Sequence, residues 1–268
     1  MHTIVSKDGT PLVCHRAGSG PPLVLVHGTG GSAARWTPIL PALGAHFTVY
    51  APDRRGRGQS GDAPEYEIER EFEDVVAVVE SIDQPAFLLG HSYGGICALE
   101  AVRLTSRVRK LVLYEPPVPV EGVPIYAPGI IDRLESLMAA GELENVATTF
   151  LLDVVRMPRH ELEMLQASPG WRDRVAAAHT LPRELRAHVR YRFQPERFKN
   201  LNVPTLLMAG GDSPQLFKAA IELLKTALPH SQVVALAGQQ HIAMDTAPEL
   251  FLREVVSFLS EANLENLT

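Results

Sequence analysis

Short, continuously apolar segments alternate with longer helical stretches along this 268-residue chain, and this alternation constrains its fold more than any other feature. The apolar segments are residues 23–26, 47–50, 86–89, 110–114, 205–209 and 233–236. A strand with one face in water alternates apolar and polar side chains, whereas a strand covered on both faces is apolar throughout. The pattern therefore predicts an α/β fold in which helices cover both faces of a mostly parallel sheet.

The start of the chain and the segments between the strands complete this prediction. Residues 3–5 and 11–16 flank a turn that contains Asp8 and Gly9, which predicts an opening hairpin. Phe72, Val75 and Val79 recur at helical spacing within residues 71–82. Further helices are expected after residue 92 to about 104, over 217–228 and over 249–259.

Residues 116–203 interrupt the alternation. This segment contains helical spacing, for example at Leu134, Leu137 and Met138, but no convincing strand. We therefore expect a single α/β domain formed by residues 1–115 and 204–268, with residues 116–203 inserted in it as a helical lid.

Composition excludes several classes of protein. A net charge of −6 argues against a surface for nucleic acid or anionic membranes. Cys14 and Cys97 are too few for a disulfide framework or a zinc site. The apolar runs are too short to cross a membrane, and residues 1–8 contain no signal-peptide stretch. With no phosphate loop or dinucleotide fingerprint, we expect a soluble cytoplasmic protein that uses no metal or cofactor.

Residues 90–94 form a G-x-S-x-G sequence between an expected strand and an expected helix. In that context the glycines permit a very tight turn, which lifts the hydroxyl of Ser92 above the sheet at the start of a helix. The N–H groups at the start of a helix favour developing negative charge. The motif predicts a nucleophilic serine; the alternative is an inert serine in a packing turn.

Together with other segments, this motif resembles the α/β-hydrolase family over nearly the whole chain. His27 and Gly28 follow the third expected strand, as in that family's oxyanion loop, and residues 53–60 are similar to its D-x-R-G-x-G-x-S turn. The position of the lid, after the sixth strand, also matches. The resemblance implies an eight-stranded, mostly parallel sheet with helices on both faces and an inserted lid.

The resemblance also implies the partners of the serine. An alcohol needs a base to act as a nucleophile at neutral pH, and His241 matches the family's late histidine. Backbone N–H groups of Thr29 and Tyr93 occupy the positions of the oxyanion hole. Position alone supports these two donors, because a backbone group has no sequence signature.

Two carboxylates compete for the acid of the triad. The family usually places an Asp after the seventh strand, but that register falls on Ser213, and Asp212 comes one residue early. Glu115 directly follows the strand at 110–114, where a buried carboxylate needs a partner such as a histidine ring. We favour Glu115 and keep Asp212 as the alternative, ahead of Asp245.

These features predict a serine hydrolase that cleaves a small carboxylic ester, thioester or lactone through an acyl-enzyme. One alternative is a lyase or cofactor-free enzyme that uses the same triad for carbon–carbon cleavage or proton abstraction. Another is a non-enzymatic ligand-binding member of the family.

Residues 171–199 hold eight basic and three acidic side chains. These charges either favour an anionic substrate group or, more simply, form a solvated helix face. Substrate identity and oligomeric state are not readable from the sequence.

Overall fold

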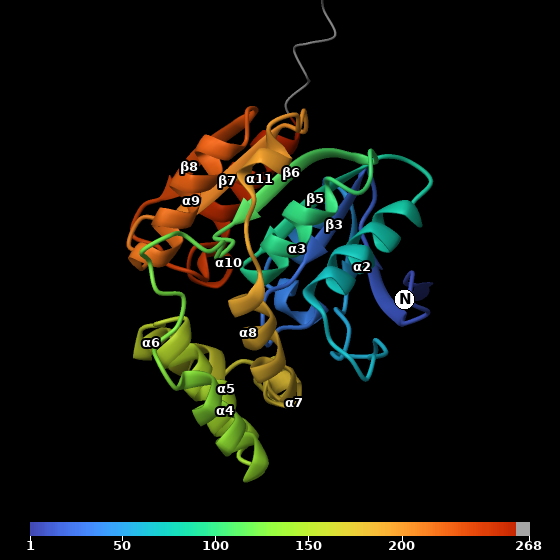
Figure 1. Cartoon of the computed structure of the whole chain (residues 1–268). Coiled ribbons are helices and arrows are strands. Elements are labelled where there is room, and N and C mark those ends of the chain that lie inside the picture. Colours follow the sequence, from blue (N-terminus) through green and yellow to red (C-terminus); the bar gives the residue numbers. More distant parts are fainter. Residues whose placement is uncertain (261–268) are drawn as a thin grey trace, which may run out of the picture.

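The computed structural model describes residues 1–260, whose centre is an eight-stranded sheet (Figure 1). The strand order is β1-β2-β4-β3-β5-β6-β7-β8. β1 and β2 are antiparallel to each other, β2 is antiparallel to β4, and the remaining neighbours are parallel. The strands are β1 (His2–Val5), β2 (Pro11–Ala17), β3 (Pro22–Val26), β4 (Thr48–Pro52), β5 (Ala86–His91), β6 (Val108–Tyr114), β7 (Thr205–Gly210) and β8 (Ser231–Leu236). This confirms the predicted hairpin and the mostly parallel sheet.

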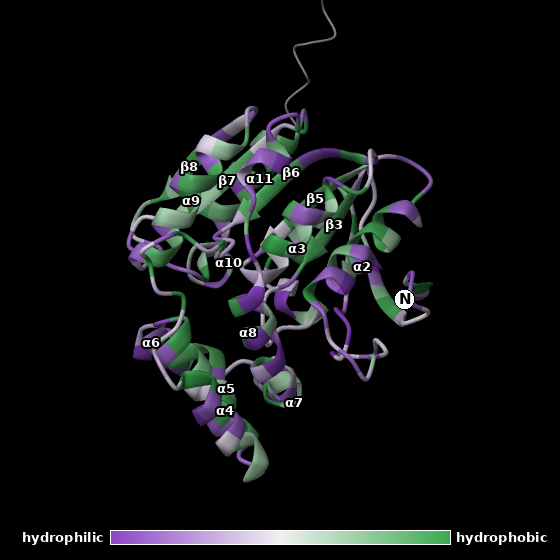
Figure 2. Ribbon diagram, viewed as in Figure 1, coloured by the Kyte–Doolittle hydropathy of each residue, from purple (hydrophilic) through white to green (hydrophobic). Residues whose placement is uncertain are grey.

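Alternate side chains of the strands enter two separate hydrophobic clusters, one on each face of the sheet. On β3, Leu23 and Leu25 belong to the cluster that holds α1 (Leu40–Gly44) and α11 (Pro248–Ser260). Val24 and Val26 belong to the cluster that holds α2 (Ile68–Glu80), α3 (Tyr93–Ala101) and α9 (Gln215–Ala227). Because successive strand residues point to opposite faces, a strand that is apolar throughout serves both clusters. The central strands are largely coloured as hydrophobic in Figure 2.

Residues 115–204, between β6 and β7, fold as helices and loops and contain no strand. The helices gather on one side of the sheet in Figure 1, near the ends of its strands. They are α4 (Ile130–Ala139), α5 (Leu143–Thr149), a π-helical turn (Phe150–Val154), α6 (Arg159–Gln166), α7 (Trp171–Ala176), a 3-10 turn (Ala177–Thr180), α8 (Leu181–Arg190) and a 3-10 turn (Pro195–Phe198).

A buried ion network connects α8 to the core. Arg54, after β4, pairs in a bidentate manner with Glu71 on α2, at 2.7 and 2.9 Å. Glu184 on α8 pairs with Arg54 and, at 2.7 Å, with Arg57. The four side chains are almost wholly shielded from solvent, so each charge depends on its partners for stabilisation.

Some short elements were not predicted from the sequence. They are the 3-10 turn Ala33–Trp36, helix α1 and helix α10 (Ala243–Thr246). Each is about one turn long, which is too short to show a helical period. Among the described residues both cysteines are free and buried, and no helix is long and apolar enough to cross a membrane.

Candidate active site

Ser92 lies in a sharp turn between β5 and α3, with φ 56° and ψ −129°, a conformation that costs energy for a residue with a Cβ. The turn brings backbone segments so close that side chains would collide. A Cβ on Gly90 would lie 2.5 Å from the carbonyl oxygen of Gly94, and a Cβ on Gly94 would overlap the carbonyl oxygens of Val26 and His27. The predicted strand–turn–helix context of Ser92 is therefore present.

The register of β5 and β6 places Ser92 beside Glu115. His91 pairs with Tyr114 at the ends of these neighbouring strands, so the residues that follow them emerge side by side. The side chain of Glu115 is wholly buried, and Oε2 accepts a 2.6 Å hydrogen bond from Nδ1 of His241. Oε1 accepts a second bond, at 2.7 Å, from the N–H of Gly210. Both oxygens thus have donors, as a buried carboxylate requires.

The structure separates the other candidate acids from His241. Asp212 is exposed, and within residues 1–260 its carboxylate has no hydrogen-bond partner. Asp245 instead pairs with both Nη atoms of Arg35. Of the three carboxylates considered from the sequence, only Glu115 is hydrogen-bonded to the histidine ring.

Packing around the imidazole of His241 restricts its orientation. Phe217 stacks on it with ring centroids 4.2 Å apart, and His91 lies 4.6 Å away on another side. Burial, with His241 nearby, lowers the pKa of His91 well below its ordinary value, so this ring is neutral. Its Nε2–H donates to the carbonyl of His241 at 2.9 Å. The packing of His91 against His241 brings together segments that are distant in sequence, and no sequence signal indicates it.

Thr29 lines the same cavity as Ser92, and Tyr93 directly follows Ser92 in the chain. Tyr93 is the first residue of α3, where an N–H has no acceptor within the helix. The N–H of Thr29 has no acceptor in the described part of the chain. The loop before it is held by His27, whose Nδ1–H donates to the carbonyl of Gly28 and whose Nε2 accepts from the N–H of Arg54. Burial lowers the pKa of His27, which keeps this ring neutral and its tautomer defined.

Ser92, His241 and Thr29 line one small cavity of about 30 Å³. The α/β core contributes Gly28, Thr29, Gly31, Arg35, His91, Ser92, His241 and Ile242. The segment between β6 and β7 contributes Phe150, Leu151, Val155, Met157, Leu165 and Arg174. A cavity of this size holds about one water molecule.

Comparison with known proteins identifies the family. A sequence model of the alpha/beta hydrolase family matches residues 23–254. The chain belongs to the alpha/beta hydrolase family. An alpha/beta hydrolase from Sphaerobacter thermophilus DSM 20745 is 35% identical, with a TM-score of 0.85 over 97% of this chain and 100% of that one.

Curated relatives of this hydrolase are enzymes. A pimeloyl-acyl-carrier protein methyl ester esterase of Aeromonas hydrophila is 28% identical over 91% of this chain and 97% of its own. A 2-(acetamidomethylene)succinate hydrolase of Mesorhizobium japonicum is 25% identical over 90% of this chain and 89% of its own. These relatives support an enzyme with hydrolase activity.

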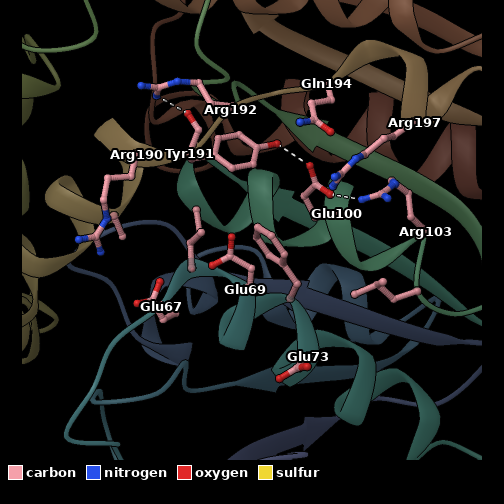
Figure 3. A pocket seen from close by; sticks show the side chains of 14 residues that line it. Glu67, Glu69, Glu73, Glu100, Arg103, Arg190, Tyr191, Arg192, Gln194 and Arg197 are labelled. Carbon is pink, nitrogen blue, oxygen red and sulfur yellow. Dashed lines mark hydrogen bonds and ion pairs between the residues drawn. The ribbon is translucent and has the colours of Figure 1, made fainter.

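A larger hollow of about 480 Å³ lies elsewhere on the hydrolase, lined by parts of α2, α3, α8 and the segment after α8 (Figure 3). Its polar side chains partly satisfy one another: Glu100 accepts from Tyr191 at 2.7 Å and pairs with Arg103. None of the candidate residues lines it. In residues 1–260 no three His, Cys, Asp or Glu side chains are grouped to hold a metal ion.

Proposed function

We propose that this enzyme is a serine hydrolase that cleaves a small carboxylic ester, thioester or lactone through an acyl-enzyme at Ser92. The observation that carries the proposal is the Glu115–His241 hydrogen bond at a cavity that His241 shares with the strained Ser92. The esterase named above lends support, because its substrate is a carboxylic ester. We further expect a small-molecule substrate, no nucleic-acid partner and a cytoplasmic location.

In the proposed mechanism, Nε2 of His241 removes the proton from Ser92 Oγ as the oxygen attacks the substrate carbonyl carbon. This nitrogen is available, since the hydrogen bond to Glu115 uses Nδ1 and Nε2 has no partner within residues 1–260. Glu115 holds the ring in the required tautomer and stabilises its charged form. The N–H groups of Thr29 and Tyr93 stabilise the oxyanion.

The protonated His241 then gives its proton to the leaving oxygen or sulfur as the bond from that atom to the carbonyl carbon breaks. Water attacks the acyl carbon in the second half of the reaction, with His241 as its general base. Collapse of the second tetrahedral intermediate returns the proton to Ser92 and releases the carboxylic acid. The net reaction consumes one water for each ester and needs no other reactant.

We propose residues 116–203 as a lid on a core of residues 1–115 and 204–268. Side chains of this segment, including Phe150, Leu151 and Met157, line the cavity at Ser92. An ester is much larger than the single water that the cavity holds, so substrate binding requires these side chains to move. The proposed lid thus excludes bulk water from the reacting carbonyl when it closes.

Hydrolysis of p-nitrophenyl acetate and butyrate, measured for the wild type and for Ser92→Ala, tests the proposal. We expect turnover by the wild type and a loss of about 10⁴-fold or more in kcat for the variant. Ser257→Ala on α11 is a matched control, since that serine is exposed and lies outside the cavity. Equal rates in wild type and Ser92→Ala would exclude Ser92 as the nucleophile. No turnover by folded wild type would contradict the ester hydrolase and favour the lyase or binding alternatives.

A further inference from the structure

Arg174, on helix α7, is the cavity's one cation without a partner among residues 1–260. Its guanidinium makes no hydrogen bond or ion pair with any described residue. The second arginine of the cavity, Arg35, is already neutralised: Nη1 donates to Asp245 Oδ1 at 2.8 Å, and Nη2 pairs with Oδ2. Arg35 therefore has a carboxylate partner at the cavity, whereas Arg174 has no ion-pair partner within residues 1–260.

Arg174 is half-buried, and its surroundings disfavour its charge. Burial, together with the positive charge of Arg35, lowers the pKa of Arg174 to about 10. The group therefore remains charged at neutral pH in a setting that disfavours charge. Asp245 acts in the opposite direction, and Asp173 lines the hollow beside the cavity, but neither carboxylate bonds to the guanidinium of Arg174. Glu161 on α6 is buried and lines neither space. An anion bound at Arg174 would supply the missing compensation.

Arg174 lies where the Ser92 cavity meets a larger space. An adjoining hollow of about 260 Å³ is bounded by α7 and by the loop that carries Gly30 and Ser32. Four residues line both spaces: Gly31, Arg35, Leu165 and Arg174. Arg174 is therefore placed to contact a molecule that occupies both spaces.

We propose that Arg174 binds a carboxylate group of the substrate, so that the enzyme acts on small esters that carry a free carboxylate. This inference rests on the proposed ester hydrolysis. A guanidinium offers parallel N–H donors that match the two oxygens of a carboxylate. The apolar side chains Phe150, Leu151 and Val155 of the same cavity suit a short carbon chain between the carboxylate and the scissile carbonyl.

A kinetic comparison tests the role of Arg174 with matched pairs of esters. In the first pair, p-nitrophenyl hemisuccinate carries a carboxylate on its acyl group and p-nitrophenyl valerate is its neutral counterpart. In the second pair, 4-acetoxybenzoate carries the carboxylate on its leaving group and p-tolyl acetate is the neutral counterpart. The quantity compared is the kcat/KM of the anionic ester divided by that of its neutral counterpart. For Arg174→Met we expect this ratio to fall about ten- to hundredfold in one pair, chiefly because KM for the anionic ester rises. Arg174→Lys retains part of the preference.

Arg172→Met is the control for a general loss of positive charge on the lid. Arg172 lies on the same short helix, is exposed and lines neither space. We expect wild-type ratios for this variant. If both pairs keep their ratios in Arg174→Met, even with lower absolute rates, Arg174 is a structural residue and the inference is wrong.

Binding to protein that cannot turn over separates this inference from the proposed function. Monomethyl succinate is titrated by calorimetry into Ser92→Ala and into Ser92→Ala with Arg174→Met, with dimethyl succinate as the neutral ligand. We expect the monoanion to bind at least about tenfold more weakly when Arg174 is replaced. Equal affinity for the two proteins would overturn the inference. Ester turnover that fails while the Arg174-dependent binding persists would instead contradict the proposed function alone.

Discussion

Ser92 and Glu115 both have positive φ, at 56° and 47°, and they follow the ends of adjacent strands. Neither residue is a glycine, so each conformation costs about 1–3 kcal/mol that the surrounding structure must offset. The N–H of Ser92 donates to the carbonyl of Tyr114 at 2.9 Å, and the N–H of Glu115 donates to that of Met208 at 3.1 Å. The sheet thus holds two strained turns at the point where the proposed nucleophile and acid meet.

Replacing Glu115 by Gln tests the acid. Glutamine keeps the size of the side chain but favours the wrong tautomer of His241 and leaves its charged form unstabilised. We expect kcat for p-nitrophenyl butyrate to fall about 10³- to 10⁴-fold. Asp212→Asn is the matched control and should retain nearly full kcat, because Asp212 is exposed and makes no bond to His241. The opposite ranking of the two variants would move the role to Asp212.

The sequence allowed part of this site to be predicted, for reasons that differ between residues. The position of Ser92 follows from glycines that only a very tight turn requires, and Glu115 was favoured because a buried carboxylate needs a partner. The part that was not predicted depends on side-chain directions. His91 contacts His241, and Arg174 lines the Ser92 cavity. Each contact joins segments that are distant in sequence, and the periodicity of a segment carries no information about such contacts.

The helices between β6 and β7 are attached to the core unequally. Helix α8 is bound to the core through Glu184, which is wholly buried and pairs with Arg54 and Arg57. Within the segment, by contrast, the pairs Arg133–Asp153 and Arg186–Glu135 are largely exposed and contribute little. We therefore expect any opening of the proposed lid to involve α4 to α7, while α8 remains in place.

Glu184→Gln tests the attachment of α8. The variant leaves two buried guanidinium groups with less compensating charge, so the free energy of unfolding should fall by about 3 kcal/mol. Urea denaturation measures this loss, and hydrogen exchange should show faster exchange in α8 than in α2. Glu135→Gln, which removes an exposed partner of Arg186, should change neither readout appreciably. If both variants behave alike, the buried network does not anchor α8.

At the scale of elements, length decided what could be predicted. The long helices α2, α9 and α11 and all eight strands were expected close to their observed bounds, with shifts of a few residues at their ends. The strand expected at 47–50 begins at Thr48 and continues to Pro52, and β5 runs on to His91. Tertiary hydrogen bonds determine where such elements end, and they are not visible in a local window.

For the whole molecule, the binary pattern of the strands predicted helices on both faces of a mostly parallel sheet, whereas the number of strands was implied by the family resemblance. A parallel strand buried on both faces is apolar throughout, as β3 is, and the predicted hairpin of β1 and β2 lies at one edge of the sheet. The pattern does not specify how the segment between β6 and β7 packs on this core. Its short helices pack through individual side chains that line the cavity at Ser92.

The account depends above all on Ser92 as the nucleophile, and mass spectrometry of the trapped acyl-enzyme tests this most directly. Wild-type protein is quenched in acid during turnover of p-nitrophenyl butyrate and then digested. We predict a butyryl mass increment on the peptide that contains Ser92, and none in Ser92→Ala. A butyryl increment on another residue would contradict the account. The account would also be contradicted by turnover without any acyl-enzyme on Ser92 under conditions where deacylation limits the rate.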